Sequence, residues 1–181
     1  MYFEPKEIIL KDGRSAVLRG PRPEEAAEML RYLDDTAAET PFLLRSPGEK
    51  SLTEEQETAY LQAGLADPDK YVIVCMVDGL LAGNCQISRR NKLKNRHRAS
   101  IGIALRKDYW GLGIGTAMFE AMIAIAKEWD LMQLELEVVE GNDRAMALYR
   151  KMGFETTGFV PNAIQMPDGT FRKEFMMVKT L

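Results

Sequence analysis

Histidine and cysteine are scarce in this sequence: its 181 residues include one histidine and two cysteines. That set is too small to supply the nitrogen and sulfur ligands of a zinc site, so no metal is expected. Cys75 and Cys85 fall on two consecutive predicted strands that turn at Asp78-Gly79. Pairing about that turn would set Cys75 near Ala82 and Cys85 near Val72, so the thiols are out of register for a disulfide. We expect both cysteines to be reduced and buried.

A strong excess of charge and a long apolar run are also missing. The formal net charge is −3, which argues against nucleic-acid binding because such proteins usually present a basic face to the phosphates. No stretch approaches the roughly 18 consecutive apolar residues of a membrane span, so no membrane association is expected. Residues 1–11 carry charges before any apolar run, unlike a signal peptide, which predicts a cytoplasmic protein. With no repeat or linker, residues 1–181 are predicted to form a single domain.

Hydrophobic periodicity and turn residues predict strands and helices that alternate along the chain. The expected strands are 8–10, 15–19, 71–77, 80–88, 99–105, 133–139, 154–160 and 171–178. The expected helices start at Pro23 and Thr53, cover 113–129, and follow Asn142 as far as Gly153. The helix over 113–129 is predicted to bury a stripe made of Ile114, Ala117, Met118, Ala121, Ile125 and Trp129. This mixture, with hairpins early in the chain, indicates an α/β or α+β fold.

The predicted strand 99–105 divides its side chains by size. One face carries Ile101, Ile103 and Leu105, and the other carries Ser100, Gly102 and Ala104. A face of small residues lets another molecule approach the backbone closely, and it suits a tightly packed helix equally well. The pattern alone leaves both interpretations open.

The sharpest local feature is a glycine loop at residues 110–116, with the sequence Trp-Gly-Leu-Gly-Ile-Gly-Thr. Bare amides and the start of a helix together can cradle a phosphate or pyrophosphate. A P-loop would need Lys-Ser or Lys-Thr directly after the glycines, and the chain has Thr116-Ala117 there. A dinucleotide fold would place G-x-G-x-x-G in its first βαβ unit, whereas this G-x-G-x-G comes late. Coenzyme A and a bare structural turn remain as interpretations.

The loop and the segment after it resemble the GNAT superfamily of N-acetyltransferases. The family pattern is [Arg/Gln]-x-x-Gly-x-[Gly/Ala] between a strand and a helix, followed by L-x-V and N-x-x-A-x-x-L-Y-x-K-x-G-F. The second half is filled at every position, by Leu136-Glu137-Val138, Asn142, Ala145, Leu148-Tyr149, Lys151 and Gly153-Phe154. Trp110 stands where Arg or Gln is usual, and Lys107 stands where many members have proline. The motif-bearing resemblance covers residues 99–160.

The resemblance implies a mostly antiparallel mixed sheet that is splayed between the strands 99–105 and 133–139 and flanked by about four helices. Acetyl-CoA is the implied donor, and its pantetheine arm would hydrogen-bond to the strand edge near Ile103 and Leu105. Asn142 would contact the same arm besides capping its helix. The pyrophosphate would rest on the loop, mainly on its backbone amides, at Trp110, Gly111, Leu112, Gly113, Ile114, Gly115 and Thr116.

Acetyl transfer to an amine needs a neutral amine and a proton for the departing thiolate. An alkyl amine has a pKa of roughly 10, so a base must help to deprotonate it. The resemblance makes Tyr149 the proton donor, although a tyrosine on a helical stripe is also typical of a protein core. Many family members carry a glutamate on the strand before the glycine loop, but Ser100 occupies that position. Glu137 is the predicted base, as the resemblance to ribosomal-protein alanine acetyltransferases implies. The alternatives are that Glu137 is an ordinary exposed strand carboxylate, and that a water molecule relays the proton to another carboxylate.

The predicted activity is acetyl transfer from acetyl-CoA to a primary amine of a small molecule or a peptide N-terminus. The alternatives are a non-catalytic acyl-CoA binding module of the same fold, and another nucleotide binder that uses the same loop. Residues 36–51 and 161–169 are expected to shape the acceptor pocket, and neither segment has a motif. The acceptor amine, the use of larger acyl groups, and the choice between monomer and homodimer stay open.

Overall fold

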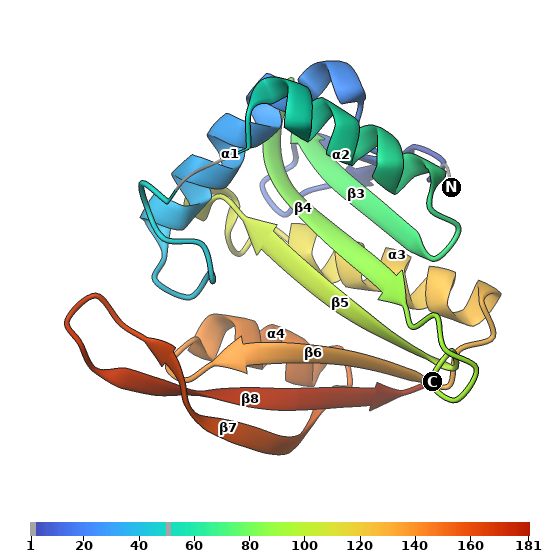
Figure 1. The fold of residues 1–181 in the computed structure, drawn as a ribbon. Coiled ribbons are helices and arrows are strands. Elements are labelled where there is room, and N and C mark those ends of the chain that lie inside the picture. The colour runs from blue at the N-terminus through green and yellow to red at the C-terminus, as the bar shows by residue number, and fades with distance from the viewer. Residues whose placement is uncertain (1–2, 50–51) are drawn as a thin grey trace.

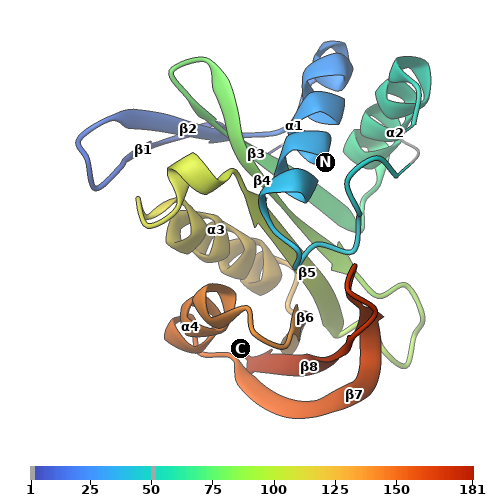
Figure 2. The same ribbon diagram turned by 90° about the vertical axis from the view of Figure 1, so that its left-hand side faces the viewer.

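The computed structural model describes residues 3–49 and 52–181. In these two ranges the strands form one eight-stranded sheet in the order β1-β2-β3-β4-β5-β6-β8-β7 (Figure 1). Neighbouring strands are antiparallel except for the pair β5 and β6, which is parallel. Helices α3 and α4 cover one face of the sheet, and α1 and α2 cover the other (Figure 2). The predicted fold, a mixed and mostly antiparallel sheet flanked by helices, is confirmed.

The elements follow the predicted order. The strands are β1 (Lys6–Ile9), β2 (Ser15–Arg19), β3 (Lys70–Val77), β4 (Leu80–Arg89), β5 (Arg98–Leu105), β6 (Gln133–Val139), β7 (Glu155–Gln165) and β8 (Phe171–Thr180). The α-helices are α1 (Ala26–Glu39), α2 (Glu54–Ala66), α3 (Ile114–Glu128) and α4 (Asp143–Lys151). Short 3-10 turns occupy Pro23–Glu25 and Lys107–Tyr109. In the described ranges, no helix combines the length and the apolar character that crossing a bilayer requires.

Helix boundaries follow the expected end signals. Thr53 and Gln56 form a capping box at the start of α2, with each side chain bonded to the other residue's backbone N–H. The Asn142 side chain accepts a hydrogen bond from the Ala145 N–H at the start of α4. Gly153 has a φ of 84° just past the end of α4, a conformation that glycine adopts without strain.

The sheet splays between β5 and β6. In the described chain these strands pair only over residues 98–100 and 133–135, and they diverge beyond that point (Figure 1). The paired end is held by Glu135, which contacts Arg98 and also lies 3.4 Å from the Arg90 guanidinium. Burial alone would raise the pKa of Glu135, but hydrogen bonds from Arg98 and Gln133 lower it overall. The strands therefore open from a fixed closed end toward the glycine loop.

A tyrosine hydroxyl interrupts the ladder between β4 and β5. Tyr32 of α1 is fully buried, and its hydroxyl donates to the Ala104 carbonyl at 2.8 Å and accepts from the Asn84 N–H at 3.2 Å. This hydroxyl thus stands between two backbone groups of neighbouring strands. It anchors α1 to β4 and to the part of β5 that no longer pairs with β6.

The register predicted for the two cysteines was off by one position. Cys75 pairs with Gly83 and Cys85 pairs with Ile73, because a β-bulge lies between Cys75 and Met76. The conclusion drawn from the register holds, since both cysteines are free and buried. Burial raises the pKa of the Cys75 thiol to about 12, so it stays protonated and unreactive.

The buried face of α3 is wider than predicted. Phe119 and Met122 are completely buried but were missed, whereas Ala117 and Trp129 are only half-buried. The reason is that α3 packs against the sheet and also against α4, so its apolar face extends around the helix. The ring centroid of Phe119 lies 5.4 Å from that of Tyr149 and 5.7 Å from that of Phe154.

The last two strands are longer than the predicted 154–160 and 171–178. Strand β7 continues through Pro161 to Gln165, with register shifts between Thr156 and Gly158 and between Val160 and Ile164. Proline cannot donate to a ladder, but it is tolerated at bulges and on edge strands, and β7 is the edge of this sheet. The proline that followed the predicted strand therefore lies within β7, at one of these register shifts.

Candidate active site

Two cavities meet where the sheet splays. The first, of about 280 Å³, lies beside the glycine loop and is bounded by Leu105, Trp110 and Leu148; we call it the loop-side cavity. The second, of about 480 Å³, is bounded by Gln86, Glu137 and other residues and is called the sheet-side cavity. Their shared lining consists of Phe42, Leu43, Ile103, Ala104, Asn142 and Tyr149. The cavities therefore form one passage between the diverging strands, from the α3/α4 face of the sheet to the α1/α2 face.

The small-residue face of β5 opens onto this passage. A Cβ atom built on Gly102 would come no closer than 3.9 Å to any atom other than those of its chain neighbours, and the nearest would be the Gln86 side chain. Gly102 lines the sheet-side cavity, as does Ala104. Of the two interpretations of this face, close approach by another molecule therefore fits better than a tightly packed helix.

The glycine loop combines a left-handed backbone conformation with free amides. Gly111 and Gly113 have φ angles of 79° and 99°, which other residues rarely adopt. Gly115 has a different role, because a Cβ there would lie 2.9 Å from a methyl carbon of Leu148, so it lets α4 pack closely. The N–H groups of the first turn of α3 have no intrahelical acceptor. A hydrogen bond of 3.0 Å from the Lys11 N–H to the Leu112 carbonyl fixes the loop to the first hairpin.

Trp110 has structural partners of its own. Its indole N–H donates to the Leu105 carbonyl at 2.9 Å, and the Arg144 guanidinium stands over its ring at 4.7 Å. The Leu105 carbonyl, predicted to meet pantetheine, thus already accepts a hydrogen bond. Arg144 and Trp110 both line the loop-side cavity. The Arg144 cation is therefore held over the aromatic ring at position 110. The family pattern has Arg or Gln at that position, within the loop itself.

A second cation lies at the start of α3. The Lys151 ammonium donates to the Thr116 hydroxyl at 3.1 Å. Lys151 belongs to the sequence motif, but the motif did not reveal that it reaches the glycine loop. The loop is thus bordered by two cations from α4, Arg144 and Lys151, next to the positive end of the α3 dipole.

Tyr149 lies at the junction of the two cavities. Its side chain is 8% exposed, and its ring packs against Phe119. The hydroxyl has no hydrogen-bond partner among the described residues, and the residue lines both cavities. Burial raises the pKa of Tyr149 to about 12, so the phenol stays protonated at neutral pH and can donate a hydrogen bond.

Two carboxylates line the sheet-side cavity, Glu137 of β6 and Glu174 of β8. Burial, and then the negative charge of Glu137, raise the pKa of Glu174. Glu174 was not predicted, because residues 171–178 do not alternate clearly between apolar and polar side chains and so do not show which face it occupies. Among the described residues, no three His, Cys, Asp or Glu side chains gather as metal ligands.

The two segments expected to shape the acceptor pocket lie at the open end of the passage. Phe42, Leu43 and Leu44 line the sheet-side cavity, and the same loop faces residues 164–167 and Gly169 across a further cavity of about 640 Å³. The Arg172 guanidinium lies 5.9 Å from the Phe42 ring centroid and donates to the Glu140 carbonyl at 2.9 Å. Lys50 and Ser51, also within the predicted segment, lie outside the described residues.

Comparison with known proteins gives the family. The sequence profile of the Acetyltransferase (GNAT) family matches residues 30–154. A Bacillus subtilis protein named as a [ribosomal protein bS18]-alanine N-acetyltransferase is 32% identical over 98 residues, which cover 54% of this chain and 62% of that protein. The L-amino acid N-acetyltransferase AaaT of Escherichia coli is 30% identical over 99 residues, which cover 54% of this chain and 61% of AaaT. The chain thus matches about three fifths of the length of each relative.

Solved structures agree with this assignment. A GNAT-family acetyltransferase from Streptococcus pneumoniae superimposes with a TM-score of 0.86 at 26% identity, over 92% of this chain and 99% of that one. The Salmonella typhimurium protein yncA, solved with its cofactor acetyl-CoA, gives a TM-score of 0.78 at 15% identity and shares the fold, over 92% of this chain and 94% of that one. The chain described here belongs to the GNAT family of acetyltransferases.

Proposed function

We propose that this protein is an N-acetyltransferase that moves an acetyl group from acetyl-CoA to a primary amine of a small molecule or a peptide N-terminus. The observation that carries the proposal is the passage through the splayed sheet, with the glycine loop at one end, two carboxylates at the other and Tyr149 between them. Such a passage lets a donor and an acceptor meet from opposite faces of the sheet. Relatives named as N-acetyltransferases support the same activity.

The residues in and beside the loop-side cavity fit coenzyme A. The amides of residues 111–116 and the cations Arg144 and Lys151 suit a pyrophosphate, because they combine free N–H donors with positive charge. Ile103 and Leu105 line an apolar wall along which a pantetheine arm would lie, with Asn142 beside it. When bound, acetyl-CoA supplies the acyl group in activated form, as a thioester.

Two residues carry the proposed chemistry. Glu137 accepts the proton that the attacking amine loses, directly or through a water molecule. The Tyr149 hydroxyl donates a hydrogen bond, and then a proton, to the sulfur that leaves as the thiol. The support for these roles is that both residues line the sheet-side cavity and that Tyr149 also lines the loop-side cavity.

The proposal is tested by calorimetric titration with acetyl-CoA, using ATP and NAD as controls, followed by a screen of amines that measures release of the free thiol. We expect micromolar binding of acetyl-CoA alone, and thiol release that depends on an amine. Binding without release across a broad amine panel would instead indicate a non-catalytic acyl-CoA binding module. Absence of acetyl-CoA binding would refute the proposal.

Gly111→Ala is expected to weaken acetyl-CoA binding about tenfold, equivalent to about 1.4 kcal/mol. A Cβ at Gly111 meets nothing within 4 Å in the protein itself, so it would project into the space proposed for the pyrophosphate. Gly79→Ala is a matched control, because Gly79 has the same φ of 79° and equally open surroundings but lies in the β3–β4 turn. Calorimetry on both variants separates the effect of a Cβ in the proposed pyrophosphate site from the general effect of placing alanine at a positive φ. Equal affinities would remove the loop from the binding site.

The pH dependence of the rate follows from Tyr149. Burial raises its pKa to about 12, so the donating form persists to higher pH than in free tyrosine and is lost only as the pH rises through that value. With a peptide acceptor, whose α-amino pKa is about 8, kcat/KM should rise as the amine deprotonates and then stay level to about pH 10. A steady-state pH profile measures this. A fall centred below pH 9 would contradict Tyr149 as the donor.

A further inference from the structure

The sheet-side cavity has two carboxylates on one wall. Val139 of β6 pairs with Glu174 of β8, and Glu137 pairs with Met176, so the two glutamates are diagonal neighbours on the same face of the sheet. Side chains in that relation stand about 7–8 Å apart. Both residues line the cavity, and neither carboxylate has a hydrogen bond or an ion pair with a described residue.

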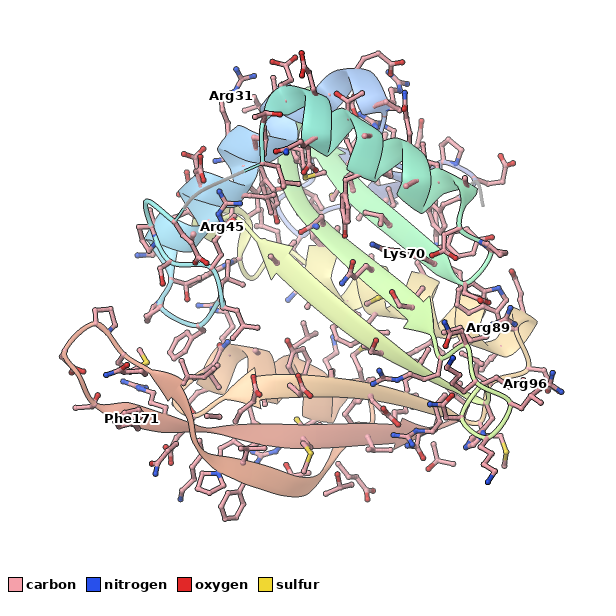
Figure 3. All side chains as sticks on the ribbon, in the orientation of Figure 1. Arg31, Arg45, Lys70, Arg89, Arg96 and Phe171 are labelled. Carbon is pink, nitrogen blue, oxygen red and sulfur yellow. The ribbon has the colours of Figure 1, made fainter. Side chains whose placement is uncertain are left out.

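No cation balances these charges within the cavity. Its described lining includes no lysine, arginine or histidine. The cavity that adjoins it at Glu137 contains Arg90 and Arg98, but both of these contact Glu135. Figure 3 shows Arg89 and Arg96 near the closed end of the splay, away from its opening. Unpaired carboxylates on low-dielectric walls concentrate a negative potential, which attracts a cationic ligand.

Two further side chains, independent of this pair, also indicate a ligand. Tyr149 is 8% exposed and lines the passage, and its hydroxyl has no partner among the described residues, so it marks where reacting atoms would lie. Asn84 and Gln86 line both the sheet-side cavity and a neighbouring cavity, and Glu57 lines that neighbouring cavity. Glu57 is only 4% exposed and has no hydrogen bond to its carboxylate within the described chain. Arg45 lines that cavity too and pairs with Asp34. Burial raises the pKa of Glu57, and the positive charges of Arg45 and Lys70 offset only part of that effect.

We propose that the acceptor carries a second cationic group, a short alkyl chain away from the amine that is acetylated, and that Glu174 binds this group. This inference rests on the proposed acetyl transfer and narrows its acceptor to diamines and related polycations. Glu137 lies on the adjacent strand, at the distance that such a chain spans. An acceptor with a carboxylate in place of the second cation would meet two unpaired negative charges, so free amino acids are disfavoured.

A matched set of acceptors tests the inference. Butane-diamine, n-butylamine and the four-carbon ω-amino acid each have a four-carbon chain with an amine at one end. The carbon at the far end carries an ammonium group in the first, is a methyl group in the second and is a carboxylate in the third. We expect kcat/KM, corrected for the fraction of neutral amine, to favour the diamine over butylamine by about 10- to 100-fold, the range of a hydrogen bond to a charged group. The ω-amino acid should be the poorest of the three.

Variants at Glu174 give the second arm of the experiment. Glu174→Gln should reduce the preference for the diamine to about threefold or less, and Glu174→Lys should raise the ω-amino acid above the diamine. Glu120→Gln is the control, because Glu120 is exposed on α3, outside the cavity. Each preference is a ratio measured on one preparation, so a smaller folded fraction cancels out.

The outcomes distinguish a failure of the inference about the second cationic group from a failure of the proposed acetyl transfer. Equal kcat/KM for the diamine and butylamine in the unmodified protein would overturn the inference and leave the proposed acetyl transfer standing. The same would follow from an unchanged preference in Glu174→Gln. Absence of thiol release with every amine would overturn the proposed transfer and the inference together.

Discussion

Tyr149→Phe is expected to lower kcat by about a hundredfold or more, the usual contribution of a positioned proton donor. Tyr149 lines both cavities, and the substitution removes its hydroxyl but keeps the ring that packs against Phe119. The affinity for acetyl-CoA should change by less than about threefold, because the amides of the glycine loop and the cations Arg144 and Lys151 are untouched. Single-turnover release of the thiol and calorimetric binding measure the two quantities.

Tyr71→Phe is the matched control for this substitution. Burial also raises the pKa of Tyr71, but its ring packs against Trp129 at the far end of α3 and lines neither cavity. Its kcat should equal that of the unmodified protein. If Tyr149→Phe behaved in the same way, the proton would have to reach the sulfur from another group, such as a water molecule.

Phe119→Ala is expected to lower the free energy of unfolding by about 3–5 kcal/mol, the range for removing a buried aromatic ring. Phe119 is fully buried, and its ring contacts the rings of Tyr149 and Phe154, so its loss leaves a cavity where α3 meets α4. Equilibrium unfolding in urea measures the change. The same variant should lose activity at temperatures where it is still folded, because the cavity also frees the Tyr149 ring to move.

Phe171→Ala serves as the comparison for stability. Phe171 begins β8 and is 54% exposed, and it stands at the edge of the molecule in Figure 3. Its truncation should cost less than about 1 kcal/mol, as is usual for surface positions. A loss for Phe119→Ala no larger than this would mean that the α3–α4 contact contributes little to the stability of the fold.

The parts of the fold that could be predicted are those controlled by nearby residues. Thr53 and Gln56 meet within one turn of α2, and Asn142 and Gly153 act at the ends of α4, so short spacings are enough to identify them. The glycine loop is local in the same sense. Its positive φ angles depend on residue type, and glycine is the residue that adopts them without strain.

The features that escaped prediction depend on contacts between distant segments. Glu174 faces the cavity only because β8 pairs with β6 in one particular register, and nothing in the residues around Glu174 sets that register. The bulge after Cys75 likewise depends on how β3 and β4 fit together, with Gly83 close to the Leu105 side chain. Phe119 was missed because α3 is covered on two sides, whereas a periodicity argument assumes one buried stripe.

The brief pairing of β5 with β6 has a consequence for the order of events in catalysis. Because the strands part after residues 98–100 and 133–135, the interior can be reached from both faces of the sheet. A molecule that enters on the α3/α4 side need not leave before another enters on the α1/α2 side. Under the proposed function, both reactants can be held at once, and the acyl group passes between them without first being stored on a side chain.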